Sequence, residues 1–193
     1  MRRIMKVLFV LTLCCLAMSR LSAQEMTNKM GNNSSFSLVK LISGDLKETA
    51  DKVIQLADAM PSEDYTWRPE EGVRSIGEVY VHIAVVNYMF LSYLGATLPK
   101  EIKPNSENED LEKTITNKED IINLVKKSFD DAQKFLSGYK DTDFDTMVEL
   151  PFGKFTKAQI LMLTATHPHE HLGQSIAYAR TNHIVPPWSK KGN

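Results

Sequence analysis

Cysteine is nearly absent from this chain. Its 193 residues include two cysteines, and these are adjacent, at positions 14 and 15. The sequence after residue 23 therefore has neither a disulfide nor a thiol nucleophile, which suits an oxidising compartment. Basic residues form no run of the kind that binds nucleic acid, so we expect no nucleic-acid partner. Long hydrophobic runs are also missing after residue 23, so we expect no stable membrane span there.

The first 23 residues have the three parts of a secretory signal peptide. Arg2, Arg3 and Lys6 precede an apolar stretch at residues 7–18, and residues 21–23 (LSA) resemble a cleavage site whose exact position stays open. The apolar stretch is short for a transmembrane helix. Four of the 23 basic residues lie in this segment, so the mature chain would have 19 basic and 24 acidic residues, a formal charge of −5. We expect export to the periplasm or the exterior.

The remainder predicts one domain. Residues 24–35 are polar and predict a disordered leader, residues 36–189 predict the folded part, and residues 190–193 predict a short tail. Apolar residues recur at helical spacing in four stretches, and Gly44 weakens the first of them, which leaves a split at that position open. The expected helices span about residues 36–60, 76–94, 117–137 and 157–182.

Two helix starts have strong local signals. Ser75 with Glu78, and Thr156 with Gln159, have the spacing of capping boxes. Four amphipathic helices without substantial strands predict an all-α protein, a four-helix bundle.

The links between the helices carry further information. The turn-rich link before the last helix predicts a short hairpin at about residues 151–153. The long charged link at residues 98–116, between the second and third helices, allows a crossover in place of strict up-down order.

Three of the five histidines fall within residues 167–171. On a helix, His167 and His171 lie one turn apart on the same face, whereas His169 lies about 160° away. A pair with this spacing can present two imidazoles to one metal ion. Gln174 and Tyr178 continue the same face, and we expect them to support the ligands through hydrogen bonds.

A third ligand has to come from another segment, and His82 is the candidate. It lies in an otherwise apolar stripe, where an unpaired imidazole would cost free energy. Three histidines would leave one metal position open for water or substrate, as in catalytic zinc sites. By themselves these residues leave another interpretation open, in which His82 is a satisfied core residue and the pair binds no metal.

The residues between the pair complicate its geometry. Pro168 removes a helical hydrogen bond, and a kink there would either aim the pair or spoil the site. We expect His169 at the surface or beside the ligands. Glu170 is a further candidate for a supporting position, but its direction away from the centre of the pair does not favour a general-base role.

Together these residues resemble the DinB-like superfamily, of the DinB and bacillithiol-transferase type, over about residues 36–189. The resemblance rests on short pieces that occur in order. They are residues 65–69 (YTWRP) and 72–76 (GVRSI), His82, residues 167–174 (HPHEHLGQ) and 178–180 (YAR), and residues 184–189 (IVPPWS).

The resemblance implies a four-helix bundle that binds a divalent metal through His82, His167 and His171, often as a homodimer. Members include thiol-dependent S-transferases and isomerases, proteins described as metal-dependent hydrolases, and many without a known reaction. His183 departs from the pattern, because a glycine commonly follows the last helix. The signal peptide is a second departure, since the characterised thiol-dependent members act in the cytoplasm.

Three functions follow as hypotheses, and the sequence leaves open whether the chain is an enzyme. The first is a hydrolase in which Zn²⁺ or Ni²⁺ activates bound water against a small molecule that the sequence does not identify. The second is an S-transferase or isomerase in which the metal binds the thiolate of a cosubstrate. The third is a non-catalytic bundle that binds metal for stability, or binds nothing.

Overall fold

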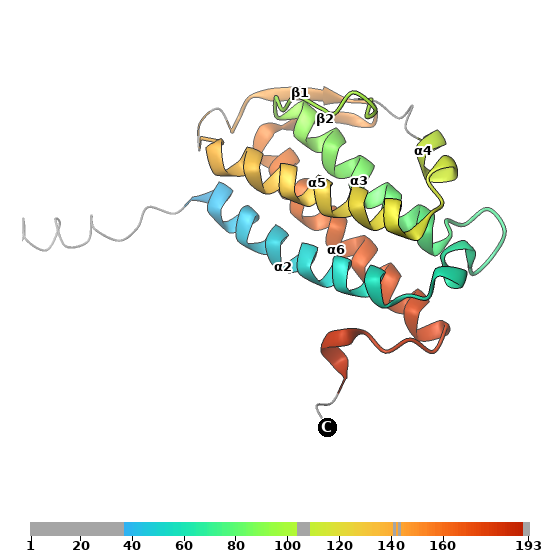
Figure 1. Ribbon diagram of the computed structural model, residues 1–193. Coiled ribbons are helices and arrows are strands. Elements are labelled where there is room, and N and C mark those ends of the chain that lie inside the picture. The colour runs from blue at the N-terminus through green and yellow to red at the C-terminus, as the bar shows by residue number, and fades with distance from the viewer. Residues whose placement is uncertain (1–36, 104–108, 141, 143, 191–193) are drawn as a thin grey trace, which may run out of the picture. The chain divides into compact units, whose positions relative to one another are not determined.

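The computed structural model describes residues 37–103, 109–140, 142 and 144–190. The predicted signal peptide and leader lie outside the described residues, as does the predicted tail beyond Lys190. Four long helices form the four-helix bundle that the sequence predicts (Figure 1). They are α2 (Leu38–Ala59), α3 (Ile76–Tyr93), α5 (Lys118–Gly138) and α6 (Lys157–Thr181). Within the described part of the chain, no helix is both long and apolar enough to cross a membrane.

The predicted capping boxes are confirmed at the starts of α3 and α6. The Ser75 hydroxyl accepts a hydrogen bond from the Glu78 backbone, and the Glu78 carboxylate accepts one from the Ser75 backbone. Thr156 and Gln159 make the same reciprocal pair. Asn117 caps α5 through its side-chain oxygen. These local bonds satisfy backbone donors that the first helical turn would leave unpaired, and so fix where each helix begins.

The helices do not follow strict up-down order. Helix α2 packs against α5 and α6, and α3 packs against the same two helices. Helices α2 and α6 run in one direction, and α3 and α5 run in the other (Figure 1). The chain between α3 and α5 therefore returns along the bundle, which is the crossover that its length allowed. It contains a short helix that the sequence analysis did not predict, α4 (Glu109–Thr114), which packs on α3.

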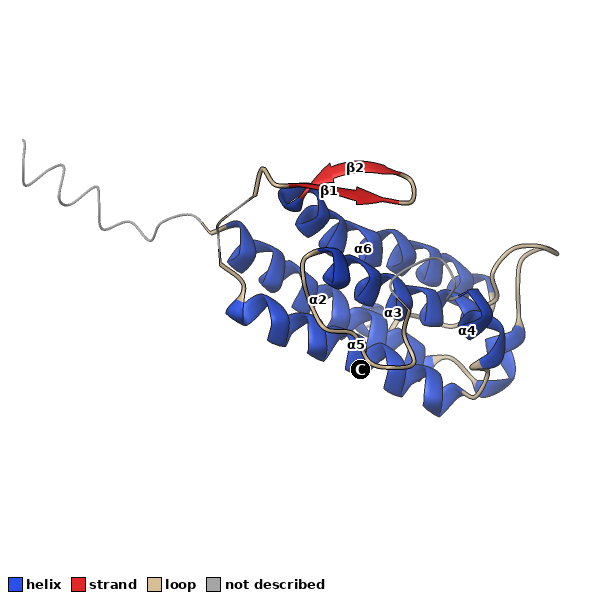
Figure 2. Cartoon of the chain, turned by 90° about the horizontal axis from the view of Figure 1, so that it is seen from above, coloured by secondary structure: helices blue, strands red, loops and turns tan. Residues whose placement is uncertain are grey.

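The predicted hairpin before the last helix is also present. Strands β1 (Met147–Leu150) and β2 (Gly153–Thr156) pair antiparallel, with Leu150 opposite Gly153. The hairpin lies outside the bundle beside α6, and β2 contacts that helix (Figure 2).

Gly44 and Pro168, two residues that can interrupt a helix, both lie inside continuous helices. Helix α2 runs unbroken through Gly44, because Ile42 and Leu46 on either side are buried in the core and hold the segment by packing. The split that the sequence left open at Gly44 therefore does not occur. Helix α6 likewise continues through Pro168, whose ring is buried. His167 and His171, which lie before and after Pro168, therefore belong to one continuous helix.

Candidate metal centre

Helices α3 and α6 are neighbours in the bundle, and they bring three histidines together. His82 extends from α3, and His167 and His171 extend from α6. The Nε2 atom of His167 lies 3.2 Å from that of His82 and 3.1 Å from that of His171. Two nitrogens bound to one tetrahedral zinc ion, with bonds of 2.0–2.1 Å, are about 3.3 Å apart. These two distances fit imidazoles bound to a single metal ion, and the ligand atoms of all three histidines lie within 4.8 Å of one another.

Outer hydrogen bonds fix which ring nitrogens carry protons. The Nδ1 of His82 is 2.8 Å from Oε1 of Glu112, and the Nδ1 of His171 is 2.8 Å from Oε1 of Gln174. Both oxygens can only accept, so each Nδ1 donates, and each neutral ring turns an Nε2 lone pair toward the centre. The Nε2 of His167 can donate to one of these lone pairs at most. The centre thus holds more lone pairs than protons, which is the condition that a cation satisfies.

Burial favours the neutral form of His167 and His171. The pKa of His167 is lowered to about 2, mainly by burial, and electrostatic repulsion between a protonated His167 and its neighbours His171, His82 and Arg74 acts in the same direction. Burial is also the main reason why the pKa of His171 is lowered. A metal binds imidazole through an unprotonated nitrogen, so both rings are ready to bind at neutral pH.

Arg74, in the loop before α3, connects Glu112 and Gln174, the hydrogen-bond partners of His82 and His171. Its guanidinium donates to both oxygens of Glu112, at 2.6 and 3.2 Å. On the other side, the Gln174 amide donates to the Tyr178 hydroxyl at 2.9 Å, and that hydroxyl donates to the backbone oxygen of Arg74 at 3.4 Å. One residue therefore joins the supports of two ligands on different helices.

Glu112 is the important residue that the sequence analysis missed. Burial alone would raise the pKa of this carboxyl, but hydrogen bonds from His82 and Arg74 hold the pKa below its usual range. An ionised carboxylate behind a ligating histidine orients the ring and makes it a stronger base. Glu112 lies on α4, in a link without helical periodicity, so no sequence signal marked it. Arg74 occurred in the family-like segment but had no assigned role.

The remaining candidates fall in two places. Gln174 and Tyr178 lie on the ligand side, where their spacing put them, and Glu170 lines a cavity together with His171. The structure does not bring His169 to the centre. Its Nε2 lies 2.8 Å from the Thr49 hydroxyl and 3.0 Å from a carboxylate oxygen of Asp45, so it ties α6 to α2.

A cavity of about 850 Å³ opens beside the candidate metal centre, with His171 in its lining. His171 and Gln174 line it from α6, Arg68 and Arg74 from the loop before α3, and Glu112 from α4. Its volume is within the range of small-molecule sites. A ligand in this cavity would lie against one of the three candidate metal ligands.

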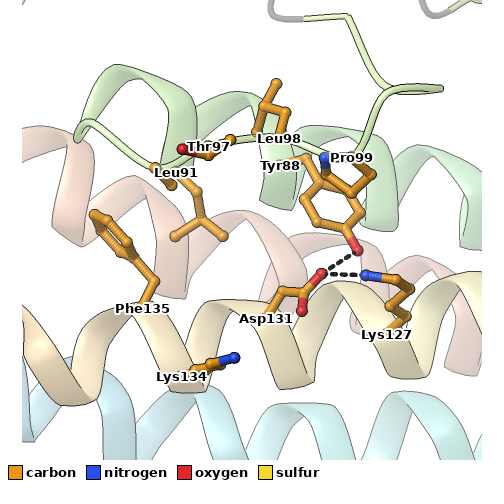
Figure 3. Close-up of a pocket in the computed structure, with 10 residues that line it drawn as sticks. Tyr88, Leu91, Thr97, Leu98, Pro99, Lys127, Asp131, Lys134 and Phe135 are labelled. Carbon is orange, nitrogen blue, oxygen red and sulfur yellow. Dashed lines mark hydrogen bonds and ion pairs between the residues drawn. The ribbon is translucent and has the colours of Figure 1, made fainter.

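A second cavity, of about 500 Å³, lies between α5 and the chain that follows α3 (Figure 3). No histidine lines it. Its carboxylate, Asp131, is already bound by the Tyr88 hydroxyl at 2.8 Å and the Lys127 ammonium at 2.6 Å. This cluster joins α3 to α5 and is not a candidate metal centre.

Comparisons with known proteins agree with this architecture. The model of the DinB superfamily matches residues 45–175, more than half of the chain. Among curated proteins none matches significantly. A DinB-like protein from Bacillus cereus has a solved structure with a TM-score of 0.60 and 21% identity, covering 75% of this chain and 94% of that one. A DinB family member from Exiguobacterium sibiricum gives 0.59 and 18%, covering 83% and 99%.

A third solved structure carries a functional description. YfiT from Bacillus subtilis has a TM-score of 0.60 and 19% identity, covering 80% of this chain and 93% of that one. It is described as "a probable metal-dependent hydrolase with an unusual four-helix bundle topology". At these identities the likeness shows the shared fold.

Proposed function

This chain belongs to the DinB superfamily, and we propose that it is an exported hydrolase whose divalent metal, Zn²⁺ or Ni²⁺, is held by His82, His167 and His171. The observation that carries the proposal is the convergence of three Nε2 atoms, two with lone pairs fixed toward the centre by Glu112 and Gln174. The description of YfiT as a probable metal-dependent hydrolase supports the reaction class.

The chain's own residues prepare the site for a ligand. Glu112 keeps the proton of His82 on Nδ1, and Gln174 does the same for His171, so neither ring has to change tautomer when a cation binds. A small molecule in the cavity would lie against His171, which lines it. When bound, a divalent ion would polarise a carbonyl or phosphoryl group and make water more acidic.

The test compares a variant of a candidate ligand, His82, with a variant of the nearby histidine that is not a candidate ligand, His169. Protein purified without an affinity tag is analysed for metal, and its activity is measured on ester, amide and phosphoester substrates before and after chelation. His82→Ala should lose both metal and activity. His169→Ala is the matched control, because it removes an imidazole from the same run of α6 that contacts α2 instead of the centre. Full activity in His82→Ala would refute the mechanism.

Export is the part of the proposal that rests on sequence alone. The support is the basic start, the apolar stretch and the LSA segment within residues 1–23. Cell fractionation followed by N-terminal sequencing of the recovered protein tests it. A new N-terminus near residue 24 in the exported fraction is expected, and a full-length cytoplasmic product would refute this part while leaving the metal site untouched.

A further inference from the structure

The charged side chains around the 850 Å³ cavity are mostly paired with one another. Three cations and three carboxylates line it. Arg68 donates to Glu78 at 3.0 Å, and Arg74 donates to Glu112 at 2.6 Å. These two pairs neutralise themselves, and they leave one cation and one anion facing the cavity.

The two left over are Lys113 on α4 and Glu170 on α6. Both are exposed, and within the described part of the chain neither has a hydrogen bond or an ion pair. The negative charge of Glu170 acts on the neighbouring His171, whose pKa it raises against the stronger effect of burial. Glu170 and His171 also line the same cavity.

Both charges line the same cavity and come from different elements, so a ligand in this cavity faces a cation on α4 and a carboxylate on α6. Building on the function proposed above, we propose that the substrate is a small zwitterion of the dipeptide type, with its ammonium on Glu170 and its carboxylate on Lys113. A dianion would find one free cation and would meet the charge of Glu170. A dication would meet the opposite problem at Lys113. A zwitterion places an opposite charge at both positions.

The cavity has a volume of about 850 Å³, which leaves room for a ligand longer than a single ion. Gly72, at a backbone φ of +81°, lines it, and a side-chain carbon built there would meet no atom within 4 Å.

The experiment uses four versions of each dipeptide on the metal-loaded full chain. They are the free dipeptide, its N-acetyl form, its C-terminal amide and the doubly capped form, in a panel that starts from alanyl-alanine and varies both side chains. Binding is measured by calorimetry and hydrolysis by product release. Each cap should weaken binding to the unchanged protein by roughly two- to ten-fold.

Two variants assign the ends. In Glu170→Gln, N-acetylation of the dipeptide should no longer weaken binding. In Lys113→Gln, C-terminal amidation should no longer weaken binding. In each variant, the other cap should still weaken binding. Glu149→Gln and Lys154→Gln on the hairpin are the matched controls, because both side chains are exposed and neither lines the cavity. Both controls should keep the full preference of the unchanged protein.

The outcomes separate this proposal from the proposed function. If the protein binds metal and hydrolyses all four forms equally well, the proposal of a zwitterionic substrate is overturned and the proposed hydrolase function is unaffected. If the protein binds the free dipeptide more tightly than the capped forms but hydrolyses none of them, the zwitterionic ligand is supported and the proposed hydrolase function is overturned. Failure of every dipeptide in the panel to bind, or an unchanged preference in both cavity variants, would also overturn it.

Discussion

Replacing Glu112 with glutamine tests whether the hydrogen bond from His82 to this carboxylate strengthens metal binding. The carboxylate is 11% exposed and lies 2.8 Å from Nδ1 of His82 and 2.6 Å from Nε of Arg74. Glutamine keeps the shape but removes the charge, and its amide can offer one good acceptor instead of two. Either the His82 ring loses its fixed tautomer, or the Arg74 guanidinium loses its partner.

The size of the effect can be estimated. Loss of a group that orients a ligating histidine lowers metal affinity by about 10- to 100-fold, which is about 1.4–2.7 kcal/mol. At a metal concentration 1,000 times the Kd of the unchanged protein, binding stabilises the fold by about 4.1 kcal/mol. In Glu112→Gln, the same concentration should contribute about 1.4–2.7 kcal/mol.

Two assays measure this change independently. Competition with a chromophoric chelator gives the Kd, and thermal unfolding with and without metal gives the stabilisation. Glu149→Gln is the control, since it makes the same chemical change at an exposed position on β1. If Glu112→Gln bound metal as tightly as the unchanged protein while His82→Ala lost the metal, the hydrogen bond from His82 would have no role in the centre.

Three further predictions concern stability. The pKa of His167 is lowered to about 2, so below pH 6.5 the unfolded chain binds one more proton than the folded chain. The metal-free protein should lose up to about 1.4 kcal/mol of unfolding free energy per pH unit between pH 6.5 and 5. Denaturant titrations should show His167→Gln with a flatter profile, and an equally steep one would contradict the assignment. His183 has a φ of 62°, so His183→Gly should stabilise the protein by about 0.5–1 kcal/mol, and a lower denaturation midpoint would refute the strain. Ala at Gly77 would place Cβ 3.1 Å from the backbone oxygen of Tyr65 and should destabilise by about 1–2 kcal/mol. Ala at Gly44 meets no atom within 4 Å and should stabilise by up to about 1 kcal/mol; an equal effect of the two alanines would contradict the packing.

The helix boundaries were predictable because their signals are local. Ser75 and Thr156 each bond to a residue three positions later, so the cap can be read from a few letters of sequence. The same holds for His167 and His171, whose spacing alone puts them one turn apart. Gly44 shows the limit of such reasoning, because its intrinsic helix penalty was outweighed by the burial of residues on either side.

The supports of the centre were only partly predictable. Gln174 and Tyr178 could be found because they continue the ligand face of one helix. Glu112 could not, because it is 30 residues from its partner His82 and lies in a link with no periodic pattern. The role of Arg74 was hidden for the same reason, since its partners belong to α4 and α6.

By itself the sequence determined the four helices, their caps and one paired set of imidazoles, since each depends on residues within about one turn of one another. The tertiary structure decided that His82 meets that pair, that His169 turns instead to α2, and that Glu112 stands behind the centre. These contacts depend on which helices are neighbours and which faces they share, and that is settled by burial over the whole bundle.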